Sequence, residues 1–213
     1  MNFTTTSIVR ILETTLWVLG LTCVGAYVAI EMQSARAQSA AISSLELQSQ
    51  LGAGNKPDQS LWSPQRIALH ERTLSDSGNL EPIALLVIPA VDIRVAAFEG
   101  TSDRVLNLGV GRVPGTGRIG VAGNLAIAGH RDGFFRGLKD VVIGDDISLQ
   151  HAGGTDEYRV TELLVVEPDD VSVLAPTDSS SITLITCYPF YFMGSAPQRF
   201  IVRADRKAGE IDY

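Results

Sequence analysis

The sequence predicts a mostly β domain that closes into a barrel and is preceded by an N-terminal hydrophobic segment. From residue 82 onward, short runs rich in Val, Ile and Leu alternate with Gly, Pro and Asp. The stretches between these runs have little of the helical periodicity that the crossovers of a doubly wound sheet require. We therefore expect a closed or nearly closed antiparallel barrel of seven or eight strands, with short helices.

The bulk composition sets the class of protein. The chain has 213 residues, of which 45% are apolar, enough for one domain with a core and an appendage. Its net charge is -7, so it offers no cationic field for phosphate backbones, which argues against nucleic acid as a partner.

Residues 1–30 are expected to form a short cytoplasmic tail and a membrane anchor. Residues 14–30 carry no charge, and as a helix they would span about 25 Å. That length is slightly short of a hydrocarbon core of about 30 Å, and Arg10 and Glu13 can snorkel to extend it. Two alternatives stay open: a buried helix of a soluble domain, and a signal peptide cleaved at the small-residue pattern of residues 35–37.

Residues 31–80 are expected to form a stalk that ends in a short helix. The stretch is rich in Gln, Ser and Ala, with Gly and Pro near its end. In "WSPQRIALHERTL", Ser63 is a suitable N-cap and Pro64 a suitable first helical residue. This helix either packs on the outside of the main domain or covers the active groove, and deletion of residues 61–76 would distinguish the two.

The main domain is assigned to residues 81–213. A short helical turn is expected in "DGFFRGLKDV", and seven strands are expected in the β-rich runs. Those runs are residues 83–90, 93–100, 124–130, 146–152, 157–166, 181–187 and 199–205.

One cysteine of this domain stands at the end of a predicted strand. In "SITLITC" the alternation places Thr183, Ile185 and Cys187 on one face. The other cysteine, Cys23, lies in the predicted span, so the two are not expected to pair. An unpaired thiol in an oxidising compartment is either buried and inert or kept for its reactivity, and both interpretations remain open at this point.

Two further side chains are expected at the same edge of the barrel. Arg199 begins the strand that follows the loop after Cys187, so antiparallel pairing would bring the guanidinium near the sulfur, whereas Arg203 would lie about 13 Å further along. Of the three histidines, only His130 directly follows a hydrophobic strand, between Gly129 and a second glycine that we expect to mark bends. Imidazole is a suitable proton carrier for a cysteine nucleophile, and arginine a suitable stabiliser of an oxyanion. A buried thiol, a surface histidine and an ion-paired arginine are the plainer explanations.

Metal binding is not predicted, because one extracytoplasmic cysteine and scattered histidines match no zinc spacing. No cofactor is expected.

Three motifs, in order, resemble those of the sortase family of membrane-anchored cysteine transpeptidases. They are "NLAIAGHRDGFFRGLKDV", the "TLITC" that ends at Cys187, and Arg199 followed by Val202 and Ala204 in the closing strand. The segments "LLVIPAVDI" and "GVGRVPGTG" are also similar to the family, and the resemblance extends from about residue 82 to 206. One departure is Asp92, where many sortases carry glycine.

The resemblance implies an eight-stranded sortase barrel with His130, Cys187 and Arg199 as the catalytic residues. It implies that Thr183, Leu184 and Thr186 shape the substrate groove. The implied substrates are proteins with a C-terminal sorting motif of the LPXTG type, cleaved through an acyl-thioester. The acceptor would be an amine of a cell-wall component or another protein. The compact loops are most similar to class D, class E or Gram-negative sortases, and the implied location is the cell surface.

Two rival functions remain. A non-catalytic, membrane-tethered β-domain would bind peptides or partner proteins without needing Cys187, and a secreted thiol protease would hydrolyse without transfer. Substitution of Cys187 separates the first from an enzyme, and an added amine nucleophile separates the second.

Overall fold

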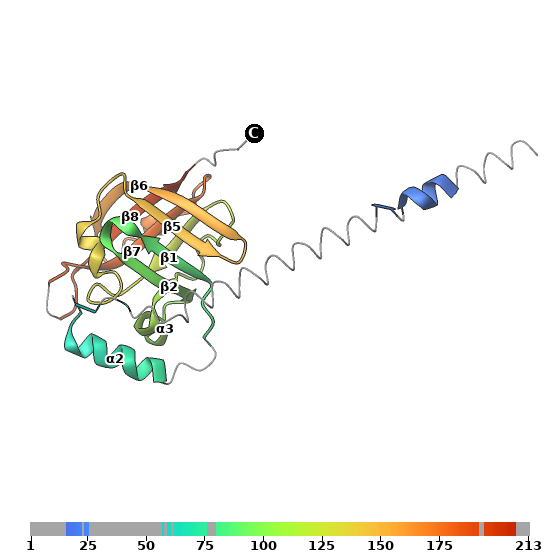
Figure 1. The fold of residues 1–213 in the computed structure, drawn as a ribbon. Helices are drawn as coiled ribbons and strands as arrows, with labels where there is room; N and C mark the ends of the chain where they lie inside the picture. Colours follow the sequence, from blue (N-terminus) through green and yellow to red (C-terminus); the bar gives the residue numbers. More distant parts are fainter. Residues whose placement is uncertain are drawn as a thin grey trace, which may run out of the picture. The chain divides into compact units, whose positions relative to one another are not determined.

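The computed structural model describes residues 16–22, 24–25, 57, 59–60, 62–75, 80–191 and 194–207. The chain divides into two compact units, Met1–Ile42 and Ser43–Tyr213. In the first unit the described residues are helical and exposed. The second unit contains the β domain (Figure 1).

Eight strands within the described residues close into one barrel, with the order β1-β2-β3-β4-β7-β8-β6-β5. Their bounds are β1 (Ala84–Ile88), β2 (Ile93–Glu99), β3 (Val110–Arg112), β4 (Asn124–Ala128), β5 (Asp146–His151), β6 (Gly154–Val166), β7 (Ser181–Tyr188) and β8 (Gln198–Arg206). The predicted mostly β, closed barrel is therefore confirmed.

Alternation of apolar and polar side chains explains why these runs form the barrel. In β2, Ile93, Val95 and Ala97 are buried in the core whereas Arg94 is exposed between them. The inward faces of the other strands contribute a core that includes Leu86, Ile88, Leu125, Ile127, Ile147, Leu149, Tyr158, Val160, Ile182, Leu184, Val202 and Ala204.

The expectation of an antiparallel barrel was wrong for two of its strand pairs. β2 pairs with β3 in parallel, and β4 pairs with β7 in parallel, while the other six neighbouring pairs are antiparallel. Parallel strands need long connections, and the one from β4 to β7 contains β5, β6 and two 3-10 segments. The parallel β4–β7 pair matters for the site because it puts the two strand ends at one edge.

The helices of the second unit lie on the outside of the barrel. The short helix predicted before the main domain is confirmed as α2 (Pro64–Ser75), and the Ser63 hydroxyl accepts a hydrogen bond from the Arg66 N–H at 3.2 Å. Figure 1 shows α2 beside α3 (Asp103–Leu108), a helix that the sequence patterns did not predict because it is so short. The predicted turn after the histidine strand is η2 (Arg136–Asp140). Two further 3-10 segments are η1 (Pro89–Val91) and η3 (Val171–Leu174).

Asp92 occupies the position where a glycine would be favoured. It caps η1 with a left-handed backbone, at φ 52° and ψ 36°. Aspartate adopts this region more readily than most residues, and glycine does so without a steric cost.

Among the described residues, no helix is both long and apolar enough to cross a membrane. Of the predicted span of residues 14–30, the structure describes residues 16–22 and 24–25, which are helical, and the rest lies outside the described residues.

Candidate active site

The register of β7 and β8 places Cys187 directly opposite Arg199. The two residues are Cα partners in the antiparallel pair, next to Tyr188 and Gln198 at the loop end. Side chains that face each other in this way lie on the same face, with Cβ atoms about 5 Å apart. The sequence prediction that these residues share one edge of the barrel is confirmed.

His130 reaches the same edge from the other side of β7. The parallel pairing aligns Ala128 with Ile185, and the ladder continues through the Gly129 N–H, which donates to the Ile185 carbonyl at 3.0 Å. His130 lies two residues after Ala128, and Cys187 lies two residues after Ile185, so the two are at matching positions beyond the paired residues. An antiparallel β4–β7 pair would have separated them by the length of the strand, so the parallel pairing brings them together.

Cys187 lies on the face of β7 that points away from the barrel core. Ile182 and Leu184 belong to the core, and alternation puts Ile185 and Cys187 on the opposite face. Cys187 forms no disulfide. Both Cys187 and His130 are half-buried. The Arg199 guanidinium donates through Nη1 to the carbonyls of Gln198 at 3.0 Å and Ala196 at 3.4 Å. Carbonyl acceptors leave the positive charge uncancelled, so it remains available to an anion at this edge.

Gly129 is required by close packing and not by a left-handed backbone. A Cβ atom there would lie 2.6 Å from Cδ2 of Phe135, whose ring is completely buried. Gly133 has no such restriction, since a Cβ would meet only ordinary contacts. Neither glycine has a positive φ, so the expected bends are not of the glycine-specific kind.

The three side chains expected to shape the substrate groove are completely or almost completely buried. Thr183 and Leu184 are 0% exposed and Thr186 is 1% exposed. Leu184 packs in the core, and the Thr186 hydroxyl donates to the Gly129 carbonyl at 2.8 Å. Because other protein atoms cover all three side chains, they are not exposed for direct contact with a substrate.

Comparison with known proteins shows the family to which the chain belongs. The profile of the sortase domain matches residues 86–207. Sortase D of Bacillus subtilis is 30% identical over 156 residues, which cover 73% of this chain and 74% of the relative. Sortase A of Listeria monocytogenes is 34% identical over 109 residues, 49% of each chain. The chain belongs to the sortase family.

Solved sortase structures share this fold. A Clostridium perfringens Sortase D5 transpeptidase has a TM-score of 0.55 at 27% identity, covering 65% of this chain and 88% of that one. A lid mutant of Sortase A from Corynebacterium diphtheriae has a TM-score of 0.58 at 26% identity, covering 70% of this chain and 98% of that one. Sortases are cysteine transpeptidases, and class D is represented among the relatives of this sortase.

Helix α2 contacts the segment that follows His130. Arg66 donates from Nε to Asp132 Oδ1 at 3.1 Å and from Nη1 to Asn107 Oδ1 at 2.6 Å. The rings of Trp62 and His70 pack edge-on against Phe134, with centroid distances of 4.7 and 5.5 Å. Sequence analysis did not predict these contacts, because nothing in the helix pattern identifies its partner.

Burial lowers the pKa of His130 below its ordinary value of 6.5, and the positive charge of Arg66 lowers it further. Asp132 and Asp103 act in the opposite direction without reversing the shift. The imidazole of this sortase is therefore mostly neutral at pH 7, the form that accepts a proton.

Two arginines of the same segment hold the loop between Cys187 and Arg199. Arg131 donates to the Pro189 carbonyl at 3.1 Å and to the Gly194 carbonyl at 2.8 Å. Arg136 donates to the Phe190 carbonyl, and its guanidinium lies 4.1 Å from the ring centroid of Tyr191. The segment after His130 and the loop after Cys187 are thus bound to each other. The sequence "HRDGFFR" contains the two arginines, but it does not indicate which carbonyls accept their hydrogen bonds.

The other two histidines have structural roles. His70 is 4% exposed, and its Nδ1 donates to the Asn107 carbonyl at 2.7 Å. His151 lies in β5, where its Nε2 is 3.3 Å from Oδ2 of the buried Asp156. Among the described residues, no group of three or more His, Cys, Asp or Glu side chains is arranged to hold a metal ion.

Proposed function

We propose that this sortase cleaves an LPXTG-like C-terminal sorting motif through an acyl-thioester on Cys187 and transfers the substrate protein to an amine. The observation that carries the proposal is the convergence of His130, Cys187 and Arg199 at the ends of three neighbouring strands. Convergence of a thiol, a proton carrier and a fixed cation is the minimum that acyl transfer from an amide requires.

In the first half-reaction, neutral His130 accepts the thiol proton and the sulfur attacks the carbonyl carbon of the threonine of the motif. The positive charge of Arg199 stabilises the developing oxyanion. The amide C–N bond then breaks while His130 returns the proton to the departing amine, leaving a thioester.

In the second half-reaction, an amine of a cell-wall component or another protein attacks the thioester. A new amide forms, the C–S bond breaks, and the proton of the attacking amine passes through His130 back to the sulfur. The products are a covalently joined substrate and free Cys187, so the cycle needs no cofactor or redox partner. Water in place of the amine would give hydrolysis, which is the peptidase side of the same chemistry.

We further propose that residues 14–30 anchor the chain as a single-pass span, with the barrel outside the cytoplasm and residues 31–80 as the spacer. The support is the charge-free run of the sequence. Membrane fractionation of the full chain and of a variant lacking residues 1–30 tests this. Retention of the shortened chain in washed membranes would contradict it.

The activity is tested with a fluorogenic LPXTG-like peptide, with and without an added oligoglycine amine. We expect an amine adduct with the wild-type chain, and neither adduct nor cleavage with Cys187→Ala. Arg206→Lys, at the opposite end of β8 from Arg199, is the matched control for Arg199→Lys and should retain full activity. Cleavage that the amine never diverts would indicate a simple protease. Peptide binding that is unchanged in Cys187→Ala, with no turnover by any chain, would indicate a binding module.

A further inference from the structure

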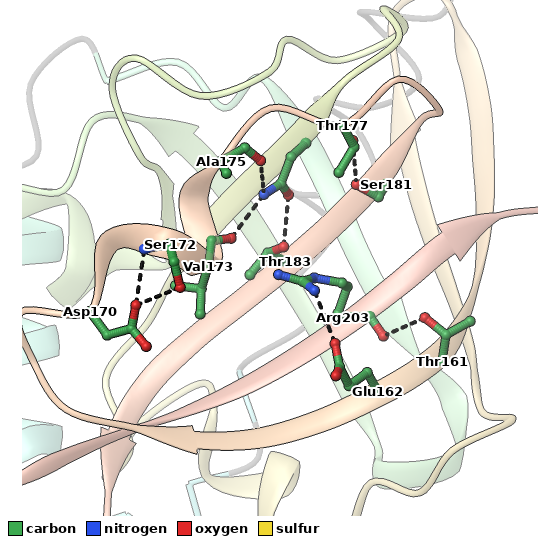
Figure 2. Close-up of polar contacts among 11 residues, drawn as sticks. Thr161, Glu162, Asp170, Ser172, Val173, Ala175, Thr177, Ser181, Thr183 and Arg203 are labelled. Atoms are coloured by element: carbon green, nitrogen blue, oxygen red, sulfur yellow. Dashed lines mark hydrogen bonds and ion pairs between the residues drawn. The ribbon is translucent and has the colours of Figure 1, made fainter.

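Asn124, at the first position of β4, is buried and uses its side-chain amide to join three parts of the chain. It is 2% exposed. Its Nδ2 donates to the Val173 carbonyl at 2.9 Å and to the Ala175 carbonyl at 3.1 Å, and its Oδ1 accepts from the Thr183 hydroxyl at 2.7 Å. Figure 2 shows these bonds as the dashed lines that end on Val173, Ala175 and Thr183.

The bonded carbonyls belong to the connection between β6 and β7, residues 167–180. In the barrel β8 lies between these two strands, so the connection must cross β8. It starts after Val166, the partner of Arg199, and ends before Ser181 at the other end of β7. It therefore passes from the edge that carries the candidate catalytic residues to the opposite edge.

The connection lies on the outer side of the barrel, the side on which Cys187 is placed. Leu125 and Ile127 of β4 face the core, so Asn124 faces outward, in line with Ser181 and Thr183 of β7. This explains why Thr183 is fully buried although it does not face the core. A peptide lying along the outer face of β7 towards Cys187 would have residues 171–175 as its neighbour.

The other hydrogen bonds of this connection that the structure describes either are local or go to β8. The bonds to β8 are from the Gln198 side-chain amide to the Glu167 carboxylate at 3.3 Å and from the Arg206 N–H to the Ser180 carbonyl at 3.0 Å. Asp170 accepts from the N–H and hydroxyl of Ser172, and the Thr177 hydroxyl bonds to the Ser181 hydroxyl (Figure 2). The Thr177 hydroxyl also donates to the Ser179 carbonyl at 2.7 Å. Such contacts shape the connection but do not attach it to β4. A buried amide with its donors and acceptor satisfied is costly to lose, because the abandoned carbonyls have no water to replace it.

We propose that Asn124 is a positioning residue that holds residues 171–175 against β4 and β7 and so determines how tightly a peptide binds beside Cys187. Thr183 assists by orienting the amide, which gives the first threonine of the "TLITC" motif a physical role. Asn124 touches none of the reacting atoms, since Ser181, its partner on β7, is about 20 Å from Cys187 along the strand. The peptide-binding part of this inference rests on the proposed function.

The test compares three variants of the full chain. Asn124→Ala removes the amide, Thr183→Val removes only the hydroxyl that orients it, and Thr177→Val removes a hydroxyl of the same connection that has no bond to β4. We expect KM for an LPXTG-like peptide to rise about tenfold in Asn124→Ala, which corresponds to about 1.4 kcal/mol. A smaller rise is expected in Thr183→Val and none in Thr177→Val. The rate at which iodoacetamide alkylates Cys187 should stay within about twofold in all three, because the thiol end of β7 is unaffected.

Hydrogen exchange gives a readout that needs no substrate. Amides of residues 171–176 should exchange faster in Asn124→Ala and, to a lesser degree, in Thr183→Val, while amides of the β7–β8 ladder keep their protection. If Asn124→Ala does not fold, the same measurements of exchange and KM are made on Thr183→Val and compared with the wild type. Unchanged exchange and unchanged KM in a folded variant would overturn the proposal. If instead the wild-type chain turns over no peptide, the proposed function fails, and faster exchange would still support the attachment itself.

Discussion

Replacing Gly129 by alanine should damage both stability and turnover, although it adds a single methyl group. The new Cβ would lie 2.6 Å from Cδ2 and 2.8 Å from Cγ of Phe135, about 0.8 Å inside the 3.4 Å at which ordinary contact begins. The ring is 0% exposed and belongs to the main core cluster, so it has no free space to enter. Overpacking of this kind costs about 1–3 kcal/mol.

The displacement would also reach His130, which directly follows Gly129. The Phe135 N–H donates to the His130 carbonyl at 3.3 Å, so the backbone at His130 is attached to the ring that must move. A shift of about 1 Å at a catalytic group can lower a rate by about 10²-fold. We therefore expect kcat to fall by one to two orders of magnitude, roughly, in Gly129→Ala.

Urea unfolding and peptide turnover are the assays, and Gly133→Ala is the matched control. A Cβ at Gly133 would come no closer than 3.5 Å to Arg66 and 3.7 Å to His130, so that variant should behave like the wild type. Adding Phe135→Leu to Gly129→Ala should recover part of the stability, because the smaller leucine leaves space for the new methyl group. A double-mutant cycle measures this coupling between the two positions. Wild-type stability and turnover in Gly129→Ala would refute the packing argument.

Two further predictions concern charges. Arg66→Ala should raise the pKa of His130 towards 6.5, because it removes a positive charge that disfavours the protonated imidazole. It also frees the Asp132 carboxylate, whose negative charge favours the protonated imidazole. A histidine-selective NMR titration measures this pKa. Asp156→Asn should lower the free energy of unfolding by about 2 kcal/mol, because the buried carboxylate loses its charge-assisted bond to Arg206, now at 2.5 Å; urea unfolding reports this.

Each of these predictions has an internal control. Arg72→Ala removes a positive charge from the same helix, in its last turn, and should leave the midpoint of His130 where it is in the wild type. An equal shift in both variants would mean that Arg66 does not act on the imidazole as described. For Asp156→Asn, turnover should be retained in the folded chain, because Arg206 lies about 23 Å along β8 from Arg199. A large loss of activity without unfolding would contradict that separation.

The sequence was sufficient to predict that Cys187 and Arg199 lie near each other at one edge of the barrel. One short loop joins their strands, and a hairpin brings its loop-proximal ends together whatever the rest of the fold does. The strands that alternate clearly, such as β2, were predicted for the same reason, since local alternation requires no knowledge of the partner strand. By contrast β3 has three residues, one of them glycine, and β3 is too short for a pattern.

The position of His130 relative to Cys187 could not be derived from spacing alone. It depends on the parallel β4–β7 pair, whose connection contains two other strands, and the antiparallel interpretation gave the wrong pairing here. The contacts of Asn124 and Arg66 were missed for a related reason. Their hydrogen-bond partners are 41 to 66 residues away, and two of these partners are backbone carbonyls, which every residue has and no sequence motif marks.

Intact-mass spectrometry of the full chain, taken shortly after mixing with a library of LPXTG-like peptides, tests the central claim most directly. We expect one added mass equal to the acyl part of a peptide, mapped to Cys187 by digestion and released by hydroxylamine. It should be absent from Cys187→Ala and much slower to form in His130→Ala. An acyl group found on another residue, or none on any residue while peptide is consumed, would contradict the claim that this thiol captures the substrate.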